Sequence, residues 1–318
     1  MSPLDRRSFL KLAAAGLIAP WGGPPTPLDD RDLPPMPDTL GRVTLPRVKI
    51  YEAPDPESGT LGTLRRDMIV PIFYEADTVG LAKHNPRWFR IRTGWVYSSY
   101  VQPVRDERQR ALVRSVPEDG FWGQVSVPFS DARAKPNPTA RITYRLYYSS
   151  VHLITDAQRD NQRQWWYRIK DDYSGFIHYV RAEHVRPIPP GEMSPLSPDV
   201  EDKLIEVNIK EQRVTAYEDG VEVYSARCAT GTYFTIEDLG TLNYTTPRGR
   251  HRIVRKRPSR HMVGAQGRSD FYDLPGVPFC TYFTESGAAI HGAYWHNDFG
   301  RPRSHGCVNL LAADALWF

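Results

Sequence analysis

Short runs of alternating apolar and polar residues make up most of the chain beyond residue 40. These runs are rich in Val, Ile, Tyr, Phe and Arg, and turn residues separate them. Alternation with a period of two is typical of β-strands, whereas the helical period is nearly absent before the last residues. Only residues 310–318 have a helical composition. We therefore expect a mainly β protein that ends in a short helix.

One strand pattern occurs twice. Its three matching pairs of segments are 88–92 with 166–170, 94–96 with 175–177, and 101–104 with 185–188. The offsets indicate a unit of roughly eighty residues including its connector. The pattern W-x-R-I followed by G-[WF]-[VI] resembles bacterial SH3-like domains, which are small barrels that commonly bind cell-wall peptides or act as spacers in exported enzymes. The resemblance implies one such domain at 43–105 and a second at 120–189.

The tryptophans of the repeat are expected to serve packing. Trp88 and Trp166 are predicted to lie in the barrel cores rather than to form a ligand platform. Trp165 cannot point to the same side of a strand as Trp166, so it is expected to be exposed or at an interface. The ligand of the repeats is not readable from these residues.

Two linkers divide the chain further. Residues 21–42 are rich in Pro and Gly, and so are residues 190–201. The domain at 202–318 then opens with alternating strands around 202–209, 212–217 and 221–224, the last two joined by a turn at Glu218-Asp219-Gly220. This order predicts a β-meander.

The N-terminus has the pattern of an export signal. Arg6 and Arg7 precede a short apolar stretch from Leu12 to Pro20, which resembles a twin-arginine signal, although Asp5 stands where Ser or Thr is usual. Residues 1–20 are therefore expected to direct the protein to the cell envelope. Pro20 obstructs cleavage after Ala19. The signal segment is therefore either removed by cleavage elsewhere or retained as an anchor. Membrane contact is expected only through this segment.

Composition narrows the class of partner. The chain has 318 residues, a formal net charge of +4 and 40% hydrophobic residues, enough for real cores. Its basic residues are scattered, and no run of Lys and Arg suggests a nucleic-acid arm. Weak attraction to an anionic envelope polymer is compatible with this charge.

One of the three cysteines has chemical partners nearby in the sequence. Cys307 lies in Ser304-His305-Gly306-Cys307-Val308-Asn309, and His291 precedes it by 16 residues. Cys228 and Cys280 lie in apolar, strand-like runs without such partners. They are expected to be buried thiols, and a disulfide between them is the alternative.

A thiol becomes a useful nucleophile when a base or a positive neighbour favours its thiolate. His305 shares a strand side with Cys307 and can reach the thiol or its surroundings, while His291 can approach from the preceding strand. Gly306 allows the backbone close to a substrate, and the amides around Gly306 and Cys307 are candidates for an oxyanion hole. Asn309 can fix a histidine tautomer or a carbonyl.

Together these residues resemble the signature of the L,D-transpeptidase (YkuD) family. Thr230-Gly231 and Thr246-Pro247-x-Gly249 are similar to landmarks upstream of that signature, so the resemblance covers about 202–318. It implies a β-sandwich catalytic domain with a cradle over the site. It also implies Cys307 as nucleophile, His291 as proton donor and acceptor, His305 as a further catalytic residue, and Ser304, Gly306 and Asn309 as residues that shape the site.

The resemblance further implies a reaction. Cys307 would attack a peptidoglycan stem tetrapeptide at its third residue, expel the terminal D-alanine, and pass the acyl group to a side-chain amine in a 3→3 cross-link. Water as the acceptor would give carboxypeptidase activity instead. No metal or other cofactor is expected, and carbapenems are expected to acylate Cys307.

Three alternatives stand beside this interpretation. A zinc site would use Cys307 with His291, His296 and His305, but these lack the paired spacing of structural zinc ligands. A papain-like protease has a different sequence around its cysteine. A protein that binds the cell wall through its repeats would not need an intact Cys307 and His291. Of the other histidines, His251 and His261 are expected on surface loops, and His296 is a candidate for lining the substrate site.

The chain stops at Phe318, 11 residues after Cys307. Members of the resembled family usually continue through the helix to a final strand. The sequence is therefore expected to be a fragment or to close its domain differently.

Overall fold

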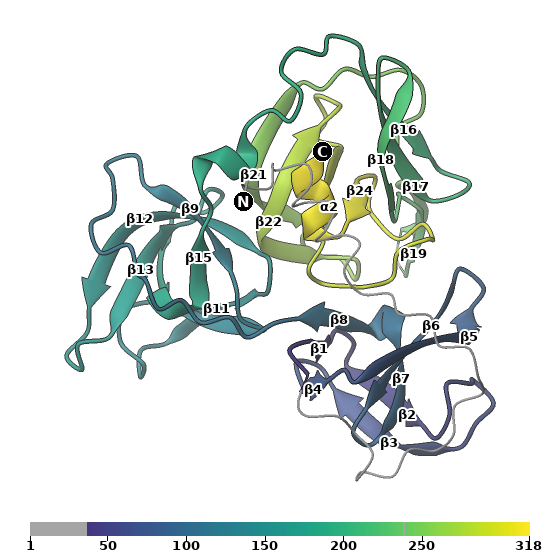
Figure 1. Cartoon of the computed structure of the whole chain (residues 1–318), viewed down its shortest axis with the longest axis horizontal. Coiled ribbons are helices and arrows are strands. Elements are labelled where there is room, and N and C mark those ends of the chain that lie inside the picture. The colour runs from purple at the N-terminus through teal and green to yellow at the C-terminus, as the bar shows by residue number, and fades with distance from the viewer. Residues whose placement is uncertain (1–36, 238) are drawn as a thin grey trace, which may run out of the picture.

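The computed structural model describes residues 37–237 and 239–318, and these form a mainly β protein, as expected. The predicted export signal at 1–20 lies outside the described residues. Figure 1 shows three groups of strands: β1–β8 in blue, β9–β15 in teal, and β16–β24 with helix α2 in green and yellow. The short α2 follows the last strand, where the sequence predicts a helix.

The first group forms two antiparallel sheets. One has the order β4-β1-β8 and the other β3-β2-β7-β6-β5. The strands are β1 (Leu40–Val43), β2 (Arg47–Tyr51), β3 (Thr60–Arg65), β4 (Ile69–Pro71), β5 (Tyr74–Ala82), β6 (Asn85–Ile91), β7 (Gly94–Tyr97) and β8 (Val101–Val104).

The second group forms one seven-stranded sheet of order β11-β10-β14-β13-β12-β9-β15. Its strands are β9 (Phe121–Val125), β10 (Phe129–Arg133), β11 (Ile142–Tyr147), β12 (Val151–Arg159), β13 (Trp165–Lys170), β14 (Ile177–Arg181) and β15 (Val185–Pro187).

The sequence repeat corresponds to a repeated order of elements. In each copy an antiparallel strand pair, β6–β7 or β13–β14, leads through a 3₁₀ turn into a short strand, β8 or β15. The two turns are Ser98–Tyr100 and Ala182–His184. Trp88 and Trp166 are buried as predicted. Trp165 is half-buried, with Arg159 over its ring.

The expected barrels do not close through strand pairing in the described chain. The edge strands β4, β8 and β15 are short, and each contains a proline: Pro71, Pro103 and Pro187. Proline lacks the N–H that a further strand would need, which leaves these sheets open. The SH3-like assignment itself stays a prediction, and so do the domain limits.

The third group contains the predicted meander and a mixed sheet. β16 (Lys203–Asn208), β17 (Arg213–Glu218) and β18 (Val221–Arg227) pair in sequence order. Asp219 and Gly220 both have positive φ in the tight turn between the last two strands, which Gly tolerates best. The mixed sheet has the order β21-β22-β23-β24, from β21 (Arg255–Gly264), β22 (Tyr272–Tyr282), β23 (Ala289–Gly292) and β24 (Val308–Leu310).

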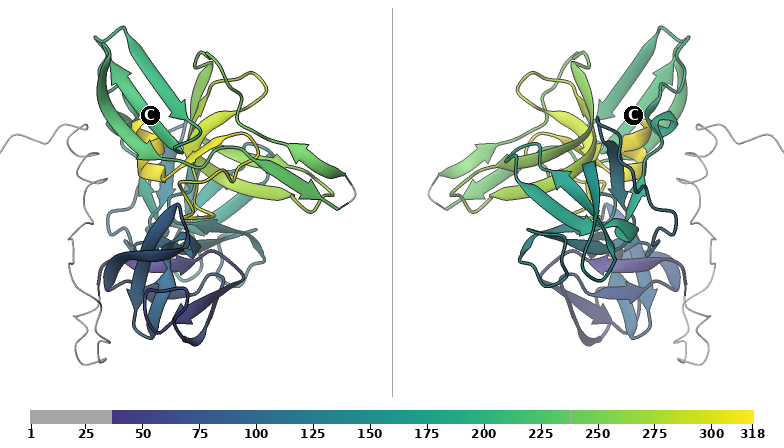
Figure 2. Two further views of the ribbon diagram at one scale, coloured as in Figure 1. Left: turned by 90° about the vertical axis from the view of Figure 1, so that its right-hand side faces the viewer. Right: turned by 90° about the vertical axis from the view of Figure 1, so that its left-hand side faces the viewer.

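A separate hairpin, β19 (Tyr233–Ile236) with β20 (Gly240–Asn243), extends away from the rest of the molecule in both views of Figure 2.

No helix within residues 37–237 and 239–318 is long and apolar enough to cross a membrane.

The two sheets of the third group share one core with α2 (Ala312–Trp317). Val214 and Ala226 of the meander and Ile290, Val308 and Leu310 of the mixed sheet belong to the same buried cluster. The helix is fixed in this core by aromatic and polar contacts. Trp317 stacks on Tyr224 at 4.4 Å, and the Tyr224 hydroxyl donates to Asp314 at 2.6 Å. Burial raises the pKa of Asp314 to about 6.

Candidate active site

Cys307 and His291 are placed by two adjacent parallel strands. β23 and β24 pair with Ile290 opposite Val308 and His291 opposite Asn309. Extending this register by one residue puts Cys307 beside Ala289. Since paired and alternate residues of parallel strands share a face, Cys307, Asn309 and His291 all face the side opposite the core residues Ile290 and Val308. The structure therefore brings the two predicted reactive side chains onto one surface.

His291 is buried and has a defined tautomer. Its Nδ1 lies 3.0 Å from the carbonyl oxygen of Gly292, which can only accept, so Nδ1 carries the ring hydrogen. Nε2 therefore keeps its lone pair. Burial lowers the pKa of His291 to about 4, which keeps the ring neutral at neutral pH. A neutral imidazole with a free Nε2 lone pair has the form of a general base.

Cys307 is half-buried, and its thiol faces main-chain groups at the start of β23 and in the turn before it. Sγ lies 4.0 Å from the Gly287 carbonyl oxygen. Burial raises the pKa of the Cys307 thiol, although a hydrogen bond from the Ala289 amide opposes this effect. Both Cys307 and His291 thus rest in their uncharged forms.

The loop before Cys307 is fixed by Ser304. The Ser304 hydroxyl donates to the Cys307 carbonyl oxygen and accepts from the Gly306 amide at 3.2 Å. Gly306 has φ of 111°, a value that favours glycine. Because Ser304 occupies the Gly306 amide, the Cys307 amide is the remaining one of the two oxyanion-hole candidates. This loop also packs closely on Gly231, where an added Cβ would lie 2.8 Å from the Gly306 Cα.

His305 pairs with a carboxylate and packs among aromatic rings. Its Nε2 lies 3.1 Å from a carboxylate oxygen of Asp270, and its ring stacks on Phe234 at 4.1 Å. Tyr244 and Tyr272 complete an aromatic surround. Burial lowers the pKa of His305, with the Asp270 carboxylate opposing it. Sequence reasoning missed Asp270 and these rings, because they come from separate hairpins and no local motif marks them.

Asn309 contacts His296, which the sequence made a candidate for lining the substrate site. His296 is buried, and its Nδ1 accepts the Asp298 amide hydrogen at 3.1 Å. Its Nε2 lies 3.1 Å from Nδ2 of the Asn309 carboxamide. Burial lowers the pKa of His296 to about 3, so this pairing persists across the neutral range. His296 therefore contacts the site strand on the face that carries Cys307 and His291.

The remaining cysteines and histidines lie elsewhere. Cys228 and Cys280 are free and fully buried, as expected, so the disulfide alternative is wrong for this structure. Within the described ranges, no group of three or more His, Cys, Asp or Glu side chains is arranged to hold a metal ion. His251 is exposed on a loop, as predicted.

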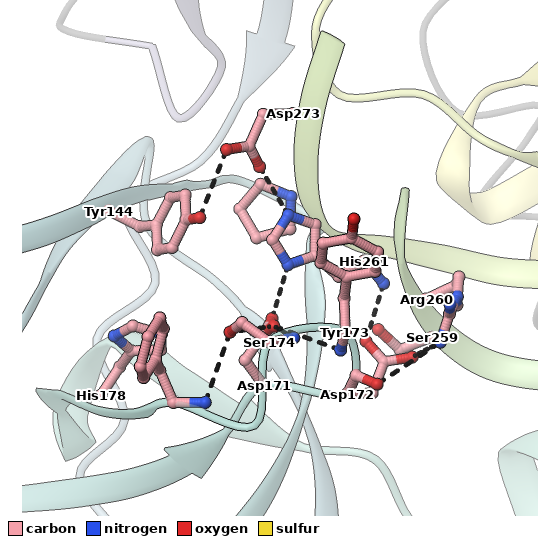
Figure 3. Close-up of polar contacts among 12 residues, drawn as sticks. Tyr144, Asp171, Asp172, Tyr173, Ser174, His178, Ser259, Arg260, His261 and Asp273 are labelled. Atoms are coloured by element: carbon pink, nitrogen blue, oxygen red, sulfur yellow. Dashed lines mark hydrogen bonds and ion pairs between the residues drawn. The ribbon is translucent and has the colours of Figure 1, made fainter. Parts of the chain in front are cut away.

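The surface-loop prediction for His261 is wrong. His261 is 2% exposed within β21, between the carboxylates of Asp171 and Asp273 at 2.7 and 2.5 Å (Figure 3). Its partner Asp171 follows β13 in the second group of strands, which the sequence alone did not place against β21.

Comparison with protein-family models finds a match over the part of the chain that contains the candidate site. The model of the L,D-transpeptidase catalytic domain (YkuD) matches residues 202–318. Residues 202–318 form an L,D-transpeptidase-like domain. The match includes every residue of the candidate site, from His291 to Asn309. No curated protein matches the chain.

Solved L,D-transpeptidase structures are also similar to parts of the chain. One from Xylanimonas cellulosilytica is 24% identical, over 43% of this chain and 65% of its own, with a TM-score of 0.29. One from Enterococcus faecium is 23% identical, over 42% and 52%, with a TM-score of 0.30. LdtMt1 in complex with imipenem is 18% identical, over 52% and 84%, with a TM-score of 0.32. The chain spans less than two thirds of the first two structures, and the assignment rests on the family match of the L,D-transpeptidase-like domain.

Proposed function

We propose that the protein is a peptidoglycan L,D-transpeptidase that forms 3→3 cross-links through an acyl-enzyme on Cys307. The observation that carries this proposal is the placement of Cys307 and His291 on one face of adjacent parallel strands, within the segment that matches the family. A thiol, a neutral imidazole and a nearby main-chain amide are the parts that acyl transfer needs.

The first half of the reaction makes a thioester. His291 Nε2 takes the proton of the Cys307 thiol, and the sulfur attacks the carbonyl carbon of the third stem residue. The oxygen of the tetrahedral intermediate is stabilised by the Cys307 amide. The bond to the terminal D-alanine then breaks, and its amine takes the proton from the His291 imidazolium. Since His291 has a pKa of about 4, its imidazolium is a strong acid for this step.

The second half transfers the acyl group. A side-chain amine of another stem peptide attacks the thioester, its proton passes to His291 Nε2, and the thiolate leaves and is reprotonated. Water in place of the amine gives the tripeptide and carboxypeptidase activity. Ser304 and Gly306 hold the loop that presents the sulfur, and Asn309 holds the strand opposite His291. His305, paired with Asp270, borders the site on its aromatic side.

Two further parts of the proposal concern location and inhibition. Residues 1–20 would export the protein to the cell envelope, where its substrate is found. Carbapenems would acylate Cys307, since LdtMt1 has been solved in complex with imipenem.

Mass spectrometry of products tests the proposal. The purified protein is incubated with a disaccharide-tetrapeptide, and a cross-linked dimer that has lost one D-alanine is expected. Cys307→Ala should abolish the dimer, while Cys228→Ala, which removes a thiol buried in the core beneath the site strands, should retain it. Tripeptide without dimer would favour the carboxypeptidase. Dimer formation by Cys307→Ala would overturn the nucleophile assignment.

A further inference from the structure

The loop between the two site strands is held by the first group of strands. Residues 293–307 join β23 to β24. Three residues of the first group contact the first part of this loop: Arg42 and His84 through their side chains, and Ser98 through its carbonyl oxygen. Asn297 donates from Nδ2 to the Ser98 carbonyl oxygen at 3.0 Å. The other two contacts involve the Arg42 guanidinium and the Asp298 carboxylate that faces His84. Hydrogen bonds to ionised groups are stronger than neutral ones, so these two contacts hold the loop more firmly.

Arg42 of β1 is a buried guanidinium that joins all three groups of strands. It donates to Gln102 Oε1 and Asp67 Oδ1 within its own group, the latter at 3.0 Å. One further N–H donates to the Tyr294 carbonyl oxygen at 2.5 Å, three residues beyond His291. The Arg42 guanidinium also lies 4.1 Å from the centre of the Tyr147 ring of β11. Tyr147 in turn stacks on Tyr294.

His84 makes the second attachment. Its Nε2 lies 2.7 Å from Asp298, whose carboxylate is 1% exposed. Asp298 also accepts from Arg301 and Arg303 of the same loop. From the other side, Arg227 donates both to the His84 carbonyl oxygen and to the Phe299 carbonyl oxygen. The loop is therefore bound to the turn at His84 through a side chain and through the main chain.

These contacts lead to the site through a continuous path. His84 contacts Asp298, the Asp298 amide donates to His296, and His296 Nε2 lies 3.1 Å from Nδ2 of Asn309. Asn309 lies opposite His291 and two residues beyond Cys307. A displacement of the loop would therefore change the position of both reactive side chains.

We propose that residues 37–104 act as an intramolecular positioning element for the site, in which Arg42 and His84 are positioning residues that hold the loop between His291 and Cys307. This inference rests on the proposed function for its catalytic consequence. It differs from a free cell-wall-binding module, because the surface used here already contacts the L,D-transpeptidase-like domain.

The test compares His84→Ala with His84→Gln in the full chain. Glutamine retains an N–H near the position of Nε2 and should restore the bond to Asp298, whereas alanine removes it. Lys49→Ala, on the exposed face of β2, is the control for a change in the same group of strands away from the loop. Small misplacement of reacting groups is costly, so His84→Ala should lower kcat about tenfold or more with KM nearly unchanged. His84→Gln and Lys49→Ala should stay near wild type.

A second readout does not depend on the substrate. Cys307 is the reactive thiol, so its alkylation rate as a function of pH reports its surroundings. His84→Ala should change that profile at a temperature where the variant is fully folded, and His84→Gln should restore it. Arg42→Lys repeats the test at the other attachment. Lysine keeps the positive charge but cannot make the several hydrogen bonds of the forked guanidinium.

The outcomes separate the possibilities. A lower Tm with unchanged kcat and an unchanged alkylation profile would overturn the positioning role. Unchanged kcat on a soluble tetrapeptide, with reduced binding to sacculi, would overturn it in favour of a wall-binding module. Suppose that the wild type forms no product while the Cys307 alkylation profile of His84→Ala still differs from that of the wild type. In that case the proposed reaction fails and the positioning role stands.

Discussion

Cys307 and His291 both rest uncharged because burial opposes charge on each. The pKa of the Cys307 thiol is raised and that of the His291 imidazole is lowered to about 4. Folding therefore favours a neutral thiol and a neutral base on the same face over a preformed thiolate–imidazolium pair. In the proposed reaction, proton transfer would accompany attack, and water exclusion by a bound substrate would strengthen the interaction of the transient charges.

The alkylation rate of Cys307 should follow this ionisation state. Below its pKa the thiolate fraction rises about tenfold for each pH unit, so the rate should keep rising beyond about pH 8.5, the ordinary thiol value. Measurement with iodoacetamide from pH 5 to 10 checks this. A plateau that begins near pH 5 would mean a stable ion pair and would contradict the neutral resting state.

Only one thiol should react in the native protein. Burial raises the pKa of Cys228 to about 12 and raises that of Cys280 further, and both side chains are fully buried. Titration with Ellman's reagent should detect one equivalent in the native state and three after denaturation. Two fast equivalents in the native protein would show that a core thiol is accessible.

The candidate catalytic residues could be named from the sequence, but the side chains that contact them could not. Cys307, His291 and Asn309 lie in a short motif whose spacing is visible in the chain. Asp270 beside His305, and Asp298 beside His84, come from loops with no local signal. Such pairs become visible only when the tertiary structure is known.

At the scale of elements, the segment around Gly231 positions the Cys307 loop. Gly231 forms a bridge to Ser304, and its amide donates to the Thr246 hydroxyl at 2.8 Å. An added Cβ would lie 2.0 Å from the Tyr244 carbonyl oxygen, a distance that no side chain tolerates. The backbone must therefore move to accept any larger residue.

Gly231→Ala should destabilise the protein by about 1–3 kcal/mol, as overpacking usually does, and should lower kcat by displacing Ser304. Thermal unfolding and product formation measure the two effects. Gly191→Ala is the matched control, since nothing lies within 4 Å of its added Cβ and its stability should be unchanged or slightly higher. Equal effects of the two changes would contradict the packing role.

The strand patterns predicted the individual strands and the helix better than they predicted whether the sheets close into barrels. The meander, its turn at Asp219-Gly220 and the C-terminal helix all follow from local periodicity and turn chemistry. The barrel closure expected for the repeats does not occur, because prolines and short edges limit pairing there. Edge pairing depends on contacts between distant strands, and alternation alone does not specify them.

At the scale of the whole molecule, a buried charged junction joins the second group of strands to the mixed sheet. Burial alone would lower the pKa of His261, but its hydrogen bonds to Asp171 and Asp273 outweigh burial and raise it. Tyr144 donates to the other oxygen of Asp273, and Arg260 pairs with Asp172 (Figure 3). The imidazolium form thus stabilises the junction.

The stability from His261 should fall as pH rises. A pKa above the unfolded value gives a contribution that is complete below about pH 6.5 and is lost as pH rises through the folded pKa. The Tm difference between wild type and His261→Gln should therefore shrink from pH 6 to pH 9. Differential scanning calorimetry measures it, and a difference that grows with pH would contradict a charged His261.

The relation between the groups of strands was beyond sequence reasoning. Arg42 and Tyr294 are 252 residues apart, and His261 and Asp171 are 90 apart. The first two groups look like independent repeats in the sequence. In the structure, both are tied by buried charges to the domain that carries the site.

Trapping the acyl-enzyme tests most directly whether Cys307 is the nucleophile. The protein is mixed with the tetrapeptide, quenched in acid within a turnover, digested, and analysed by mass spectrometry. The peptide containing Cys307 should gain the mass of the acyl group, with one D-alanine released for each acyl group bound. An unmodified Cys307 during active turnover, or an acyl group on another residue, would contradict it.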